Sequence, residues 1–431
     1  MKKIWLLVIF TACFHLLPCQ EIDQCDYGFV LFDGTKLFSM YESNQNYASL
    51  YRMGVRLTDD LISDKTILLG IKLLIRPTFI AFTHEEGHRS ILTHYGIPSI
   101  SQPFFNLNGA AYVKGVEDAI LHRLRLEDLP SFIRLHTAGL ESDYCITQKE
   151  FALAAFNQDS WDTLIWDAGW REFGILNYLM SGMMVTVFEK AMAPLTNEKT
   201  AELYRKTYDM MLYGFDEEEN EWERDIVGHD VLGMIRHLHN PESEFHRYTK
   251  YSELNEEEKN MLIRIGLKSL INIVNPFFIG KPNFKIGDDL FVGGNAAYSL
   301  APFGDFIEQN IYVKKGIWNI SFYARESQNR YNWFPSFGIA LHDVGVTDWF
   351  SFSTGLHYWM QPENLDFNTS TAMHGGAVEG DVTFYLPNIT SDYFKSLGIS
   401  AGGVFKTAGF MSEVESHKTF WRIRAGVVVR Y

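Results

Sequence analysis

The chain has 431 residues, of which 46% are hydrophobic and 21% are charged, so it can form a folded protein of two or three domains. Its formal net charge is -15 at pH 7, and it carries no basic stripe interleaved with aromatic residues. Composition and charge therefore argue against a nucleic-acid-binding protein.

The first residues resemble an export signal. Two lysines precede an apolar stretch from Ile4 to Leu17, which is short for a membrane span. We predict a signal peptide over residues 1–19; a lipid anchor on Cys13 and an uncleaved anchor helix are the alternatives. Beyond it, Cys25 and Cys145 are expected to form one disulfide in an oxidising compartment or to stay as two free thiols.

Before residue 284, apolar residues recur with a helical period. One apolar run, Ile67 to Phe82, leads directly into the pattern H-E-x-x-H. On a helix, His84 and His88 lie on one face and can bind one metal ion. Glu85 can then take a proton from a metal-bound water. The sequence therefore predicts a metal site on a helix, with Glu85 as its general base.

A catalytic zinc ion takes a third protein ligand and leaves one position open. Glu141 is the first candidate, because the small residues before it would let its helix pack closely on the motif helix. Asp143 and His136 are the reserve candidates. His94 is a further candidate, although the glycine that would turn the chain before it is missing.

The set His84, Glu85, His88 and Glu141 resembles the gluzincin branch of zinc peptidases. This resemblance implies that His84, His88 and Glu141 hold Zn²⁺, that Glu85 is catalytic and that the substrate is a protein or peptide. The position of Asp143 relative to Glu141 departs from the spacing of well-known gluzincins.

Peptide hydrolysis also requires a donor for the oxyanion of the transition state. His229 with Asp230, and His237 with His239, are candidates for this donor or for a partner of a metal ligand. Tyr144 is a further candidate.

From about residue 290 the apolar period becomes two. In the last segment Trp421 and Ile423 face one way, and Arg422 and Arg424 face the other. Eight such segments begin near residues 290, 305, 316, 333, 349, 376, 395 and 418. They predict an eight-stranded antiparallel β-barrel that resembles those of bacterial outer membranes. A soluble β-sandwich or lipocalin-like barrel is the alternative.

We therefore predict an α+β multidomain protein. A signal peptide (1–19) precedes a mostly helical, zincin-like domain (20–283) and an eight-stranded outer-membrane-type barrel (284–431). The predicted function is a zinc-dependent peptidase of the bacterial cell envelope. Its barrel would contact outer-membrane lipid, and its helical domain would lie in the periplasm. The alternatives are a non-catalytic outer-membrane protein whose helical domain binds a partner and uses the metal structurally, a lipoprotein with a soluble β domain, and an intramembrane protease.

Overall fold

A computed structural model describes residues 25–34, 38–102, 104, 111–195, 198–213, 220–386, 389 and 394–431. The predicted signal peptide lies outside the described residues. The α-helices are α2 (Met40–Leu61), α3 (Lys65–His94), α4 (Asp118–Glu127), α5 (Leu129–Ala155), α6 (Trp161–Met192), α7 (Glu198–Tyr213), α8 (Asp230–His239) and α9 (Glu256–Ser269). The strands are β1 (Asp26–Asp33), β2 (Ile100–Gln102), β3 (Tyr112–Lys114), β4 (Phe284–Lys285), β5 (Leu290–Ala301), β6 (Gly304–Lys315), β7 (Trp318–Gln328), β8 (Trp333–Thr347), β9 (Phe350–Pro362), β10 (Ala372–Leu386), β11 (Ser396–Lys406) and β12 (Phe420–Arg430).

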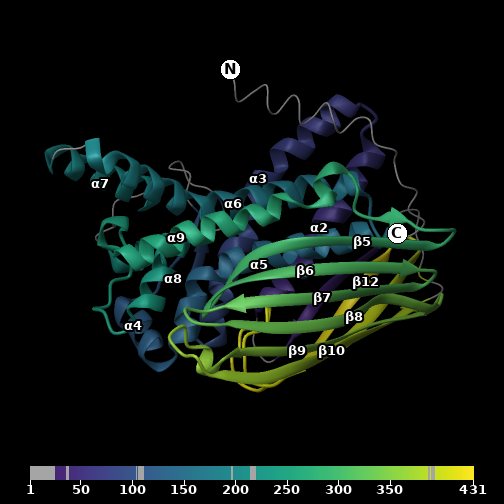
Figure 1. Ribbon diagram of the computed structural model, residues 1–431. Helices are drawn as coiled ribbons and strands as arrows, with labels where there is room; N and C mark the ends of the chain where they lie inside the picture. The colour runs from purple at the N-terminus through teal and green to yellow at the C-terminus, as the bar shows by residue number, and fades with distance from the viewer. Residues whose placement is uncertain are drawn as a thin grey trace.

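Ten of these strands form one antiparallel sheet in the order β1-β12-β11-β10-β9-β8-β7-β6-β5-β4. The sheet is strongly curved, and the helices lie along its open side (Figure 1). It is not closed, because β1 and β4 are its edges and β5 does not pair with β12. The prediction of a mostly helical domain followed by a closed eight-stranded barrel is therefore wrong. The reason is that β1, from the start of the chain, takes the place beside β12 that closure would require for β5.

Two asparagine side chains from helical segments pair with backbone groups near the two edges of the open sheet. From α2, Asn46 accepts a hydrogen bond from Val30 N (2.7 Å) and donates one to Val30 O (2.9 Å) on β1. On the other side of the sheet, beyond the two residues of β4, Asn272 does the same for Tyr298 N and O on β5, at 2.5 and 3.2 Å. An unpaired sheet edge leaves its N–H and C=O groups without partners. Each asparagine thus provides partners for the backbone of one residue, Val30 or Tyr298.

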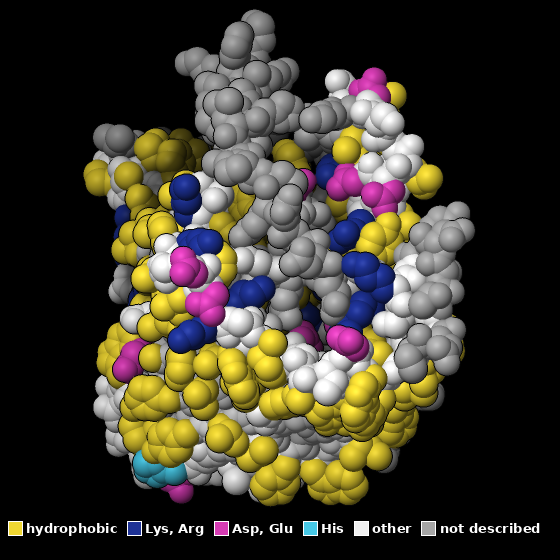
Figure 2. Space-filling model, turned by 90° about the vertical axis from the view of Figure 1, so that its right-hand side faces the viewer, with side chains coloured by type: hydrophobic (Ala, Val, Ile, Leu, Met, Phe, Trp, Pro, Cys, Tyr) yellow, Lys and Arg dark blue, Asp and Glu magenta, His cyan; other side chains and the backbone are white. Residues whose placement is uncertain are grey.

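The two faces of the curved sheet are inverted in polarity. On β12 the apolar Trp421 and Ile423 are 68% and 57% exposed, whereas Arg422 and Arg424 are buried on the inner face. There Arg424 pairs with Asp381 at 2.8 Å. Figure 2 shows hydrophobic side chains gathered over the lower part of the molecule, where the sheet lies. The sheet therefore turns its apolar side chains outward and buries its ion pairs.

Helix α5 is the central element, because it packs against α3, α6, α8 and β5. The largest apolar cluster joins residues of this helix to α8, α9 and β5, including Leu140, Leu232, Leu262 and Tyr298. No described helix is both long and apolar enough to cross a membrane. Of the two outcomes expected for the cysteines, the structure has free thiols at Cys25 and Cys145.

Candidate metal centre

Close packing of α3 on α5 positions the H-E-x-x-H segment. A Cβ atom at Gly87 would lie only 2.4 Å from the carbonyl oxygen of Ala138, so the two backbones approach more closely than any other residue would allow. Ser142 of α5 donates a hydrogen bond to Thr83 O of α3 at 2.9 Å. The histidines of α3 are therefore held directly against α5.

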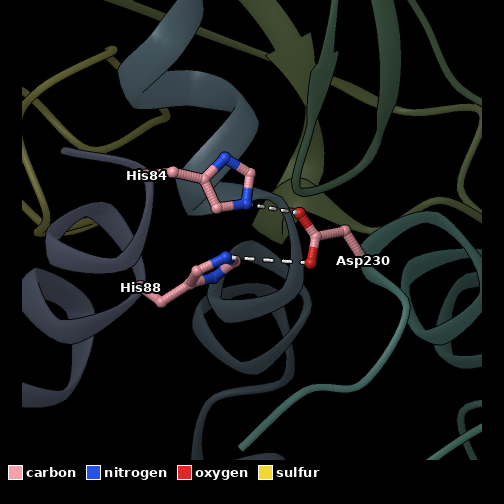
Figure 3. Close-up of side chains that lie close together, drawn as sticks. All are labelled: His84, His88 and Asp230. Carbon is pink, nitrogen blue, oxygen red and sulfur yellow. Dashed lines mark ion pairs between the residues drawn. The ribbon is translucent and has the colours of Figure 1, made fainter. Parts of the chain in front are cut away.

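Three side chains converge at this contact: His84 and His88 from α3, and Asp230 from the first turn of α8 (Figure 3). His84 Nε2 lies 3.3 Å from Asp230 Oδ2, and His88 Nε2 lies 3.7 Å from Asp230 Oδ1. The three residues are buried, their ligand atoms all lie within 4.8 Å of one another, and the group could hold a metal ion.

The second ring nitrogen of each histidine is fixed by a protein acceptor. His84 Nδ1 lies 2.8 Å from Asp143 Oδ2, and His88 Nδ1 lies 2.6 Å from Leu135 O. Metal-binding histidines characteristically donate their other N–H to a carboxylate or a carbonyl, which sets the tautomer and the ring orientation. Both Nε2 atoms are therefore the ones that face Asp230, and each can bind a metal ion when it carries no proton.

The space between these ligand atoms depends on Gly139 of α5. A Cβ atom there would lie 2.4 Å from His84 Nε2 and 2.5 Å from His88 Nε2. Asp230 Oδ2, which faces the same space, is buried and has no hydrogen-bond partner among the described residues. Two imidazoles and a carboxylate are a donor set that zinc accepts. The residues therefore fit a metal ion.

Burial dominates the electrostatics of the site. It raises the pKa of Glu85 well above its usual range, and nearby carboxylates, including Asp230, add to the increase. Burial lowers the pKa of His88. For His84, burial lowers the pKa, but contacts with Asp143 and Asp230 outweigh it and the net shift is upward. For Asp230, burial raises the pKa, but the two histidines outweigh it and keep the carboxyl ionised.

A buried chain of hydrogen bonds supports Asp143 from behind. Arg171 Nη1 donates to Asp143 Oδ1 at 2.6 Å, and Arg171 Nε donates to Asp167 Oδ2 at 2.7 Å. Tyr47 from α2 donates to Asp167 Oδ1 at 2.6 Å. Arg171 and Asp167 are both fully buried. Through Asp143, this chain fixes the imidazole of His84 to α6 and α2.

An aromatic side chain from α6 contacts one of the metal-binding candidates. The ring of Tyr178 stacks on His84 with centroids 5.5 Å apart. Tyr178 also contacts His229, at 5.6 Å between centroids. Burial raises the pKa of Tyr178 well above its usual value, and the charges of Asp230 and Glu85 add to this. The phenol therefore stays protonated and can donate a hydrogen bond.

Glu141, the predicted third ligand, does not belong to this group. Its carboxylate accepts hydrogen bonds from Arg134, with Oε1 at 2.6 Å from Nη2 and Oε2 at 2.9 Å from Nε. It also accepts from Glu413 N at 2.9 Å, in the connection between β11 and β12. Glu141 is thus occupied in a buried ion pair, and Asp230 lies in the position that had been predicted for it.

Of the other residues predicted from the sequence, some lie at the site and others lie in its surroundings. Asp143 orients His84, and Asp230, named as a possible donor or partner of a ligand, lies at the ligand position. His136 and His237 form a neighbouring buried pair, with ring centroids 5.4 Å apart. Further away, His94 contacts Phe420, His239 contacts Phe367, and Tyr144 donates to Glu308. None of the last group belongs to the three-residue metal group.

Comparison with known protein families, with curated proteins and with solved structures finds no match for this chain. The interpretation of the site therefore rests on its own geometry. Sequence reasoning missed Tyr178 and Arg171, because both lie in a helix whose apolar and polar residues gave no motif. The only signal for Asp230 was its place beside His229.

Proposed function

We propose that the protein is a zinc-dependent hydrolase that cleaves peptide bonds. The observation that carries this proposal is the orientation of the two histidines. Asp143 and Leu135 O hold both Nδ1 atoms, so that both Nε2 atoms face Asp230 across the space left by Gly139. Two histidines and one carboxylate leave a position open, as catalytic zinc sites do, whereas structural sites usually have four protein ligands.

Zinc held by such a set lowers the pKa of a coordinated water toward neutrality. The chain's own residues would do the rest. The positive charge of a bound ion would offset the burial that raises the pKa of Glu85. Glu85, next to His84, would then accept the proton of that water and pass it to the leaving amine. Tyr178 would donate its O–H to the developing oxyanion. Arg171 would hold the carboxylate of Asp143 in place, and thereby keep His84 in one tautomer.

The choice of a peptide as substrate rests on the resemblance of H-E-x-x-H to zinc peptidases. It is tested with Glu85→Gln, assayed for zinc content and for cleavage of a mixed peptide library. We expect wild-type protein to bind about one zinc ion per chain and Glu85→Gln to keep the metal but lose cleavage. Glu86→Gln is the matched control, because Glu86 is equally buried but pairs with Arg89.

Zinc binding without cleavage by the wild type would support the alternative, a partner-binding protein whose metal is structural. Full activity in Glu85→Gln would contradict the proposed mechanism outright. Loss of activity in both Glu85→Gln and Glu86→Gln would indicate damage to the helix rather than loss of a base.

The outward face of the sheet supports contact with lipid as the setting of this activity. Residues from seven neighbouring strands form one cross-strand row, and each is between 41% and 68% exposed. The row runs through Ile311, Phe322, Ile339, Leu356, Val378, Phe405 and Trp421. Each member pairs directly with the next, so the row is continuous from β6 to β12. Soluble proteins rarely expose so long an apolar surface without a partner.

The dimensions and polarity of this face fit a bilayer. From Trp421 to Val429 the outward positions of β12 span about 27 Å, close to the roughly 30 Å of a hydrocarbon core. Charged residues at outward positions of β6 and β7, Lys315 and Glu326, lie toward the ends of their strands. In a bilayer every backbone group needs a partner, and Asn46 and Asn272 provide partners for Val30 and Tyr298.

Flotation with phospholipid vesicles tests lipid contact. Wild-type protein should float with the vesicles, and Phe322→Glu combined with Leu356→Glu should leave it in the dense fraction, because charge on the row is costly in lipid. Lys315→Glu, at the end of β6, is the control and should float. Flotation of the row variant would refute contact through this face. A bacterial outer membrane, with the helices on its periplasmic side, stays a prediction.

A further inference from the structure

An elongated apolar pocket lies between α2 and α3 and takes no part in the proposed chemistry. Its volume is about 580 Å³, within the range of pockets that hold one small ligand. Aromatic and aliphatic side chains form most of its wall, among them Tyr47, Leu50, Phe79, Phe82 and Phe104. Such a lining favours an apolar ligand.

The shape of the pocket is that of a groove along one helix. Its lining residues on α2 run from Glu42 to Thr58, which corresponds to about 24 Å along the helix axis. Charged groups of the lining lie toward its ends: Glu42 at one end, and Lys72 at the other, where Lys72 Nζ pairs with Asp59 at 2.7 Å. A long, narrow and apolar space fits a single hydrocarbon chain better than a compact or polar ligand.

The pocket also adjoins the sheet edge and opens at the surface. Asn46, which lines it, is the residue that holds Val30 of β1. The rim residues Leu50, Phe79 and Phe104 are 56%, 43% and 49% exposed. Large apolar side chains at a pocket mouth are unfavourable in water and favourable beside lipid. The opening therefore lies beside the β1 edge of the sheet and presents apolar side chains at the surface.

We propose that this pocket binds one acyl chain of a membrane lipid. The proposal rests on the lipid contact proposed above, and it does not depend on hydrolysis. The chain would lie along α2, against Phe79 and Phe82, with its head group at the surface. The metal ligands His84 and His88 point from α3 toward α5 and not into this pocket, so the lipid is a bound partner and not the substrate.

The test uses full-length protein and vesicles that contain a phospholipid with a diazirine at the end of one acyl chain. Gly54 lines the pocket, and a Cβ atom there would meet nothing within 4 Å. A side chain at Gly54 therefore begins in open space, and Gly54→Leu would extend apolar atoms from the lining of the pocket. Gly169→Leu on α6 is the matched control, because its Cβ also meets nothing within 4 Å but lies outside the pocket lining. Both changes favour a helix, so both variants should fold.

We expect light-induced labelling of wild-type protein at α2 and α3, at least a fivefold reduction in Gly54→Leu and no change in Gly169→Leu. Equal labelling of the two variants would overturn the proposal, as would labelling by a free diazirine fatty acid but not by the phospholipid. Zinc content and peptide cleavage should be unchanged in Gly54→Leu. Flotation of both variants separates failure of this site from failure of lipid contact through the sheet.

Discussion

The buried pair of Arg134 and Glu141 allows a quantitative test of whether Glu141 stabilises the fold or binds the metal. The Arg134 side chain is fully buried, and that of Glu141 is 3% exposed. Glu141→Gln leaves a buried guanidinium without its counter-ion, which typically costs about 3–5 kcal/mol. Arg134 keeps three further acceptors: Val414 O at 2.7 Å, Glu415 O at 3.1 Å and Met411 O at 3.3 Å. We therefore expect the free energy of unfolding to fall by an amount near the lower end of this range, about 3 kcal/mol.

Urea unfolding followed by tryptophan fluorescence measures this loss as a shift of the midpoint at constant slope. The matched control is Glu202→Gln, which breaks an exposed pair with Lys206 on α7 and should cost at most about 0.5 kcal/mol. Zinc content is measured on the same samples. Glu141→Gln should retain its zinc, because the carboxylate is turned toward Arg134.

Two results would refute this reasoning. A loss as small as that of Glu202→Gln would mean that the Arg134 pair contributes little to the connection between α5 and the β11–β12 segment. Loss of zinc without loss of stability would mean that Glu141 is a ligand after all.

Three further predictions concern pH, the reaction and the sheet edge. Burial raises the pKa of Glu172 to about 7, so the stability associated with its proton is complete below about pH 4.5 and is lost as the pH rises to about 7. Glu172→Gln should therefore gain up to about 3 kcal/mol of unfolding free energy over wild type across this window. The same difference between variant and wild type at pH 4.5 and at pH 8 would contradict this. Tyr178→Phe should keep zinc and KM but lower kcat about 100-fold, which steady-state kinetics measures; unchanged kcat would remove Tyr178 from the reaction. Asn46→Ala should cost about 1–3 kcal/mol, because it leaves Val30 N and O without their partner; an unchanged urea midpoint would show that water replaces it.

Features that depend on local periodicity could be read from the sequence. Strands β5 to β12 correspond to the eight segments whose apolar residues alternate, because alternation directly reflects the two faces of a strand. The placement of His84 and His88 on one face of a helix is equally local. Asp143 was also identified, although as a reserve ligand rather than as the partner of His84.

Features that depend on distant contacts could not be read in this way. Asp230 meets His84 only because α8 packs against α5, and no spacing rule relates residues so far apart. The open sheet has the same cause: β1 precedes all the helices that the structure describes, yet pairs with the last strand. The partners of Asn46 and Asn272 at the two edges are likewise tertiary. Glu141 satisfied the expectation of an acidic residue on a second helix, but it forms an ion pair with Arg134, two turns earlier.

The central claim is that His84, His88 and Asp230 hold one zinc ion in the space left by Gly139. Elemental analysis of purified protein tests it most directly, on wild type, Asp230→Ala, Gly139→Ala and the control Gly169→Ala. A methyl group at Gly139 would meet both Nε2 atoms, whereas one at Gly169 meets nothing within 4 Å. The account predicts about one zinc per chain in wild type and Gly169→Ala, and loss of zinc in the other two. Full zinc content in Asp230→Ala and Gly139→Ala would contradict it.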